Sequence, residues 1–434
     1  MADLFVLGLF CALLLGCVAC GAPILYALTA GLLLFALDAR RRGHAWGSVC
    51  RMALDGVSSV KNILLTFLFI GVLTALWRAA GTIPVIVCAA ASLIRPSVFL
   101  LAVFLLNCSI SLLTGTSFGT AATVGVISAA MAPAMGADLR LVGGAVLSGA
   151  FFGDRCSPVS TSALLVAECT GTNLYDNIRR MLQTARVPFL LAALIYAALG
   201  LRTAGGGEIP DLAALFGGAF RLHWVAALPA VVVLALAACR LPVRRAMGAS
   251  ILSAVPLCLL LQGMDAVSLL RTAVFGYRSA DPAVAAMMDG GGVLSMVRVG
   301  AIVCLSSSYA GIFRKTGLLD GLRERVRLFT ARTTDFCGVL ATGVLVCMVA
   351  CNQTLATLLT AQLCEDEARS AADLALDLED SVIVTAALVP WSIAGAAPLA
   401  TIGAPTSAML FACYLYFLPL WRLLRSFRKK GKSD

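Results

Sequence analysis

Long apolar runs, separated by short polar segments, make up most of this chain. The apolar positions are continuous and do not alternate, which favours membrane helices of about 20 residues and excludes an outer-membrane β-barrel. The runs lie at residues 3–37, 62–79, 97–113, 138–152, 186–201, 223–239, 249–262, 293–312, 335–351, 379–398 and 404–424. Several are short or broken by Gly and Pro. The pattern predicts an all-α polytopic membrane protein of roughly 11–13 helices.

Composition agrees with this prediction. The 434 residues are 60% hydrophobic and 13% charged, whereas soluble domains are about 25% charged. Soluble globular and disordered classes are therefore excluded. The sixteen cysteines lie mostly inside apolar runs, where a thiol is by default a small buried hydrophobe. The Cys17–Cys20 pair has no His partners, so we expect no metal centre and no cofactor.

The placement of basic residues indicates how this chain is oriented in the membrane. The net charge of +10 comes from 33 basic and 23 acidic residues, and the basic residues cluster in short loops and the tail. That placement indicates membrane orientation and not nucleic-acid binding. Arg40–Arg42 follow the first helix pair, and Arg428–Lys432 follow the last run. We expect a multi-pass protein of a bacterial-type inner membrane with both termini in the cytoplasm.

The sequence contains signs of an internal repeat. Trp77–Gly81 and Phe313–Gly317 each end an apolar run, and about thirty residues later a polar cluster follows, Thr114–Ser117 and Asn352–Thr354. An acidic site comes after each cluster. The first copy starts from a basic segment and the second ends in one, which points the copies in opposite directions. Inverted repeats with broken helices are the signature of secondary transporters.

The repeat suggests a division of the chain. It comprises an N-terminal helix pair (1–39), a first transporter repeat (40–201), linking and bridging helices (202–262), a second repeat (263–424) and a basic cytoplasmic tail (425–434). Residues 82–94 and 318–330 are too short or too charged to span, and we interpret both as helices at the membrane interface.

The most informative polar segment is Gly153–Ser162. Asp154 follows an apolar, Gly-rich run, where a charge is costly unless it is paired, hydrated or lining a cavity. Pro158 disfavours helix at Ser157, so the helix is predicted to unwind there. A carboxylate beside freed carbonyls suits a hard cation such as Na⁺. The alternative is a helix-ending loop in which Asp154 pairs with Arg155 or Arg179.

Two hydroxyl- and amide-containing segments are further candidates for the same site. Thr116, Ser117 and Thr120 belong to a small, hydroxyl-rich cluster that suits the tip of a re-entrant hairpin, and Thr116 with Asp154 and Ser157 would be the Na⁺ ligands. Asn352 and Thr354 are the second-half counterpart. In both cases simple helix packing is the alternative.

Glu379 and Asp380 open an apolar run that Pro390 is predicted to break. They are candidates for ion binding, or alternatively dipole partners at a helix N-terminus. Arg298, inside another run, is a candidate charge partner for the site. The sequence has no Walker A, HExxH or GxSxG motif, so no enzyme is indicated and transport would use an ion gradient.

At these segments the chain resembles the NhaC-type sodium/proton antiporters of the ion transporter superfamily. The resemblance rests on Gly81–Pro84, Gly115–Thr123, Ser148–Asp154 with Ser157–Pro158, Gly290–Gly292, Thr316–Leu319, Leu378–Ser381 and Val389–Trp391. It implies an inner-membrane antiporter that exchanges Na⁺ for H⁺ by alternating access. The family pattern after Ser-Pro usually reads Ser-Asp-Thr-Thr-Asn, whereas this chain has Ser160–Leu164, without the acid and the amide.

Our interpretation is therefore a cation/proton antiporter in which Na⁺ and H⁺ compete for Asp154. Its partners would be the lipid bilayer and the transported ions; a homodimer is left open. The first alternative is an exchanger of a small organic acid or amino acid coupled to Na⁺ or H⁺. A passive channel and a membrane-embedded enzyme are further alternatives.

A topology reporter tests the predicted orientation. Phosphatase fused after Lys432 should be inactive, and a cytoplasmic reporter at the same position should be active, because basic residues follow the last apolar run. Active phosphatase there would reverse the orientation assigned to both repeats.

Overall fold

The computed structural model describes residues 2–20, 22–158, 160–203, 212–239, 241–316, 323–365 and 368–430. Within these ranges the chain is helical almost throughout and forms no strand, apart from one isolated bridge between Tyr277 and Gly290. The all-α prediction is therefore confirmed.

The first half of the chain is a series of helices interrupted at polar or Gly- and Pro-containing positions. They are α1 (Ala2–Ala19), α2 (Ile24–Arg41), α3 (Trp46–Ser59), α4 (Lys61–Ala79), α5 (Thr82–Leu93), α6 (Pro96–Thr114), α7 (Ser117–Thr120), the π-helix η1 (Ala121–Gly125), α8 (Val126–Met131), α9 (Leu139–Cys156), α10 (Thr161–Thr170) and α11 (Leu174–Thr203).

The remaining helices lie partly within the predicted apolar runs of the second half and partly between those runs. They are α12 (Leu212–Gly217), η2 (Trp224–Ala227), α13 (Leu228–Ala238), α14 (Val243–Pro256), η3 (Leu257–Leu261), α15 (Ala266–Phe275), α16 (Pro282–Met288), η4 (Val293–Met296), α17 (Val297–Thr316), α18 (Arg323–Arg332), α19 (Asp335–Ala350), α20 (Gln353–Cys364), α21 (Ala371–Asp380), α22 (Val382–Thr385), η7 (Ala386–Leu388), α23 (Ile393–Thr401), η8 (Thr406–Phe411) and α24 (Cys413–Lys430).

Several helices meet the length and hydropathy of a membrane span. Four do so alone among the described residues, namely Lys61–Ala79, Pro96–Thr114, Leu174–Arg202 and Arg244–Leu261. A fifth span is broken, because Ala371–Leu388 and Ile393–Thr401 meet at 54°. Other apolar helices are shorter. The structure is thus that of a polytopic membrane protein, and the number of spans stays a prediction.

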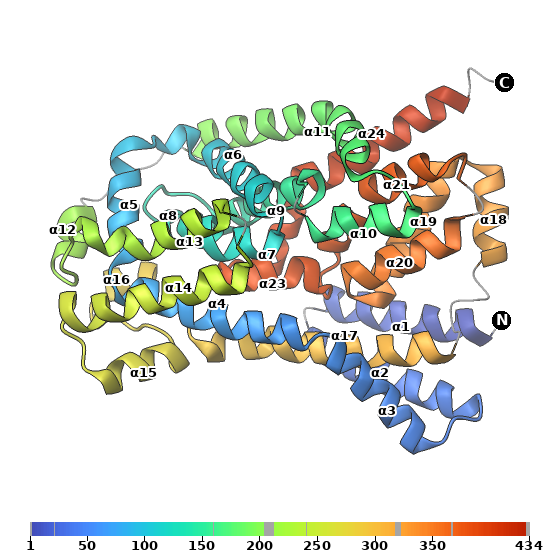
Figure 1. Ribbon diagram of the computed structural model, residues 1–434, viewed down its shortest axis with the longest axis horizontal. Coiled ribbons are helices and arrows are strands. Elements are labelled where there is room, and N and C mark those ends of the chain that lie inside the picture. The colour runs from blue at the N-terminus through green and yellow to red at the C-terminus, as the bar shows by residue number, and fades with distance from the viewer. Residues whose placement is uncertain are drawn as a thin grey trace.

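The helices run mainly along the long axis of the molecule (Figure 1). The N-terminal helices α2 and α3 pack against α17 from the second half, while α9 packs against α6, η8 and α24. The two ends of the chain lie at the same end of the molecule in Figure 1, as an even number of spans would require. Which side of the membrane that end faces stays a prediction.

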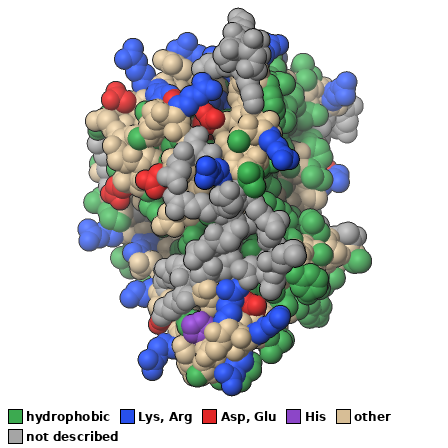
Figure 2. Space-filling model, turned by 90° about the vertical axis from the view of Figure 1, so that its right-hand side faces the viewer, with side chains coloured by type: hydrophobic (Ala, Val, Ile, Leu, Met, Phe, Trp, Pro, Cys, Tyr) green, Lys and Arg blue, Asp and Glu red, His purple; other side chains and the backbone are tan. Residues whose placement is uncertain are grey.

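Charged side chains are scattered over this end of the molecule (Figure 2). Figure 2 looks onto it and shows Lys, Arg, Asp and Glu side chains scattered over the face, with hydrophobic side chains gathered along one edge. Such a division fits a surface that meets water beside a flank that meets lipid.

Glycines allow the closest helix contact at the centre of the fold. A Cβ added to Gly149 of α9 would lie 2.6 Å from Cβ of Asn107 on α6, and one added to Gly153 would lie 2.2 Å from the backbone nitrogen of Leu112. Small residues four apart let two membrane helices approach with their backbones nearly touching. This crossing fixes where the end of α9 lies.

The two halves share one type of helix break. After α6, Gly115 is left-handed (φ 63°, ψ 28°) and Thr116 is extended (φ −150°, ψ 127°). After α19, Cys351 is left-handed (φ 53°, ψ 11°) and Asn352 is extended (φ −141°, ψ 124°). Thr116 and Asn352 then cap the following helix with their side chains.

A second break also occurs in both halves. Ser157 ends α9 at φ −85° and ψ 136°, and Ser160 caps α10. Val389 follows η7 at φ −85° and ψ 117°, and Ser392 caps α23. Each break therefore has the form X-Pro-x-Ser, because Pro158 and Pro390 occupy the second position. The matching conformations support the internal repeat; the inversion of the copies stays a prediction.

Three predicted segments differ from the structure or lie partly outside the described residues. Glu379 and Asp380 do not open a helix but end one, α21, which Ser370 caps ten residues earlier. The alternative that they are dipole partners at a helix N-terminus was therefore wrong. The start of α21 was not recognised in the sequence because its first turns contain polar residues. Of the second interfacial segment, 323–330 belong to α18, while 318–322 lie outside the described residues, as do 204–211 of the linker.

The close crossing of α6 and α9 predicts the effect of a larger residue there. Gly153→Val should prevent the two helices from meeting and lower the yield of folded protein, because the new side chain meets backbone and not a mobile side chain. Gly16→Val is the matched control, since nothing lies within 4 Å of that position. Size-exclusion chromatography and thermal melting in detergent measure both; equal behaviour would contradict the crossing.

Candidate functional site

Asp154 lies in the last turn of α9, directly before the break, and is buried. The amide of Gln353 donates to its carboxylate, with Nε2 3.5 Å from Oδ2. The backbone N–H of Ser117, at the start of α7, is also bonded to it. No ion pair reaches Asp154 from the described part of the chain. The carboxylate is thus held by neutral donors alone.

The break itself is stabilised by two serines. The hydroxyls of Ser160 and Ser162 both donate to the backbone oxygen of Asp154, Ser162 at 2.8 Å. That oxygen would otherwise lack an intrahelical partner, because Pro158 has no N–H. Ser160 also accepts from the N–H groups of Ser162 and Ala163. The sequence can therefore unwind at this depth without leaving the freed backbone unsatisfied.

Gln353 joins the two halves of the protein at this point. It is the first residue of α20, and its Nε2 lies 3.1 Å from the backbone oxygen of Ile383 as well as near Asp154. The left-handed Cys351 and extended Asn352 aim α20 toward the first-half break. The polar clusters of both halves therefore meet at one carboxylate.

Glu379 is a second buried acid beside this carboxylate. Its side chain is fully buried, and neither carboxylate oxygen has a hydrogen-bond partner. Asp154 and Glu379 are close enough to repel each other electrostatically. An unpartnered carboxylate in a membrane interior is costly unless a proton or a cation neutralises it.

Arg155 forms its ion pair with Asp380, the residue that follows Glu379. Its guanidinium is fully buried and forms an ion pair with Asp380, also fully buried. Nε donates to the backbone oxygen of Glu379 at 3.1 Å, and Nη2 donates to Thr184 of α11 at 2.9 Å. Arg155 thereby ties the broken end of α9 to the end of α21. The alternative pairing of Arg155 with Asp154 was wrong, because the side chain points across to the second half.

A second arginine completes the buried charge cluster. Arg422 of α24 forms ion pairs with Asp377 and, at 2.8 Å between Nε and Oδ2, with Asp380. Arg155 and Arg422 thus serve Asp377 and Asp380, two carboxylates one turn apart on α21. Asp154 and Glu379 are the two buried acids of the cluster that form no ion pair among the described residues.

The predicted hydroxyl ligands differ in the groups to which they bond. Ser117 lies at Asp154 through its backbone, and Ser157 donates its hydroxyl to the oxygen of Leu112 at 2.6 Å. Thr116 caps α7, and Thr120 donates to the backbone oxygen of Thr116 at 2.9 Å. All four belong to the segments that meet where α6, α7 and α9 pack together.

The site residues predicted in the second half outside α21 do not bond to Asp154 in the structure. Asn352 caps α20 through Leu355, and Thr354 is exposed, whereas Gln353 between them contacts Asp154. Arg298 is exposed on α17 and has no ion pair among the described residues. The arginines of the buried cluster are Arg155 and Arg422.

The departure from the family pattern after Ser-Pro lies on the outer face of α10. Thr161 and Leu164, which replace the usual Asp and Asn, are both exposed, while Ser160 and Ser162 face Asp154. The substitutions therefore leave the hydroxyls at the buried carboxylate in place.

Broken helices that meet around a buried, uncompensated carboxylate define a class of membrane protein, the secondary transporters. Comparison with known sequences gives the family. Residues 4–171 and 151–421 match the Na⁺/H⁺ antiporter family, and the chain belongs to it. The sequence-based resemblance is confirmed.

Three relatives show the range of that likeness. The chain is 27% identical to the malate-2H⁺/Na⁺-lactate antiporter of Bacillus subtilis, over 96% of this chain and 92% of the relative. It is 28% identical to the Na⁺/H⁺ antiporter NhaC of the same organism, over 89% and 88%. It is 26% identical to the arginine/ornithine antiporter ArcD of Halobacterium salinarum, over 85% and 79%.

The buried ion pair predicts a non-additive pair of substitutions. Arg155→Met should destabilise the protein by about 3–5 kcal/mol because it leaves Asp380 buried beside one fewer cation. Adding Asp380→Asn should recover much of the loss, since the amide can still accept from Thr184. Thermal melting in detergent gives the coupling between the two positions.

The control is an exposed pair, Arg369 and Asp335, whose nitrogen and oxygen lie 2.9 Å apart. Arg369→Gln should leave the melting temperature nearly unchanged, because solvent screens exposed pairs. Strictly additive effects of the Arg155 and Asp380 substitutions would show that the two side chains do not act as a unit.

Proposed function

We propose that the protein is a cation/proton antiporter of the inner membrane that moves Na⁺ out and H⁺ in by alternating access. The observation that carries the proposal is Asp154, a buried carboxylate at a helix break that is held by neutral donors and lacks a fixed cation. An acid in this setting favours an external positive charge.

Competition at one carboxylate couples the two fluxes. Na⁺ and H⁺ cannot neutralise Asp154 at the same time, so each arriving ion displaces the other. Hydroxyl and carbonyl oxygens around the break, from Ser117, Ser157 and Leu112, suit the oxygen coordination that a hard cation takes. The empty, charged site is disfavoured at this depth, which suppresses return of the carrier without cargo.

Loss of the Asp154 carboxyl should abolish exchange. In proteoliposomes with an internal pH dye, Asp154→Asn should show no Na⁺-driven proton movement, because an amide cannot release a proton or balance a cation. Asp154→Glu should keep partial activity with a shifted pH profile. Asp335→Asn, an acid of an exposed pair, is the control and should exchange normally. Full exchange by inserted Asp154→Asn would remove this residue from the mechanism.

A second function has its own supporting observation. Relatives named for malate, lactate, arginine and ornithine match most of the chain, and a polar cavity of about 540 Å³ beside α21 is lined by Arg180, Arg369, Arg422 and Arg425. An exchanger of a small organic acid or amino acid coupled to Na⁺ or H⁺ is the alternative. Counterflow of labelled solutes in the same proteoliposomes separates the two, since an ion antiporter accumulates none.

A further inference from the structure

Three helices converge on the carboxylate site. α10 begins after Ser160, which bonds Asp154; α20 begins at Gln353, which also bonds it; and α21 ends at Asp380, next to Glu379. The three pack against one another along their length. The site is therefore the inner end of a seam between α10, α20 and α21 (Figure 1).

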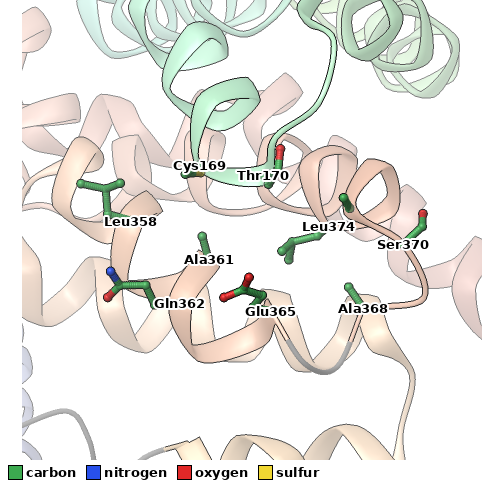
Figure 3. Close-up of a pocket in the computed structure, with 10 residues that line it drawn as sticks. Cys169, Thr170, Leu358, Ala361, Gln362, Glu365, Ala368, Ser370 and Leu374 are labelled. Atoms are coloured by element: carbon green, nitrogen blue, oxygen red, sulfur yellow. The ribbon is translucent and has the colours of Figure 1, made fainter.

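A cavity lies at the outer end of the same seam. Its volume is about 260 Å³. Figure 3 shows the last residues of α10, Cys169 and Thr170, above it, with Gln362 of α20 and Glu365, which directly follows that helix, below. Leu374 of α21 closes one side. All three helices that converge on the carboxylate site thus also line this cavity.

The two ends of the seam each carry an acidic residue. Glu365 lies on the wall of the cavity at the outer end. Glu379 lies at the inner end, where it is fully buried and its carboxylate oxygens have no hydrogen-bond partner.

Charge distinguishes this cavity from the larger one on the other side of α21. The larger cavity has four arginines on its wall against the three carboxylates Asp335, Asp373 and Asp377. Among the described residues that line the smaller cavity, Glu365 is the charged one, and none is basic. A cation is therefore attracted to the smaller cavity and repelled by the larger one, where arginines outnumber carboxylates.

We infer that the cavity between α10, α20 and α21 is the cation entrance of the transporter, with Glu365 as the acid that concentrates the cation at its mouth. The inference rests on the proposed function and adds the route to its site. Under the predicted orientation the entrance faces the cytoplasm, the side from which Na⁺ would be taken up for extrusion.

The cavity does not reach the carboxylates in this conformation, since neither Asp154 nor Glu379 is among its lining residues. Leu358, Ala361 and Leu374 form apolar parts of its wall and offer a cation no oxygen ligands. Passage to the carboxylates therefore requires the packing of α10, α20 and α21 to open. That movement is the opening of one side in an alternating-access cycle.

A native thiol tests the route. A membrane-impermeant, positively charged methanethiosulfonate applied to everted vesicles should modify Cys169 and reduce Na⁺/H⁺ exchange at least fivefold, and Na⁺ should slow the modification. Cys169→Ser, compared with its own untreated sample, should resist the reagent. Mass spectrometry establishes that Cys169 is modified. Full exchange by modified protein, or inhibition that persists in Cys169→Ser, would overturn the route.

A pair of charge substitutions tests the choice between the two cavities. Glu365→Gln should raise the half-saturating Na⁺ concentration roughly twofold to fivefold at low ionic strength, with the maximal rate unchanged and the effect fading in high salt. Arg425→Gln on the other cavity should leave Na⁺ saturation as it is. The reverse outcome, or equal saturation in all three proteins, would overturn the assignment.

The two proposals fail in different ways. Absence of Na⁺-driven proton movement in the unmodified wild-type protein removes the proposed function. Normal exchange that neither Cys169 modification nor Glu365→Gln alters removes the entrance alone and leaves the carboxylate site standing.

Discussion

The buried ion pair between Arg155 and Asp380 is the constraint on which the centre of this protein depends. Two unlike charges in a membrane interior are stable only as a pair with further hydrogen bonds, and Arg155 obtains these from α11, α21 and α24. The pair joins the end of α9 to the end of α21. It therefore constrains the positions of Asp154 and Glu379, the acids that directly precede Arg155 and Asp380 in the chain.

The broken helices follow from the same reasoning about unsatisfied groups. A helix can end inside a membrane only if its last carbonyls and the first N–H groups of the next helix find partners. Serine supplies them at both X-Pro-x-Ser breaks, where Ser160 and Ser392 cap the helices that follow. The proline stops one helix and the serine starts the next, so local sequence alone fixes these two breaks.

This locality explains what the sequence could and could not predict. Asp154 and its break were identifiable because a charge, a proline and small residues stand together within an apolar run. Gln353 and Arg155 were harder, since their roles depend on partners some two hundred residues away. The start of α21 was missed because Asp373 and Asp377 make its first turns look like a loop, although each acid has an arginine in the folded protein. Adjacent charges in sequence, such as Asp154 and Arg155, point to different partners because successive helical residues face different directions.

The paired breaks also have an evolutionary consequence. Asp154 stands three residues before Ser157, and the same position before Val389 is Ala386, buried and apolar. The two breaks therefore differ in chemistry: the first carries the acid, and the second half supplies the amide of Gln353 that contacts it. A break of this form thus accommodates either an acid or an apolar residue three positions earlier. A lineage built on such a framework can change its cargo by one substitution at a time, which fits the variety of solutes named among its relatives.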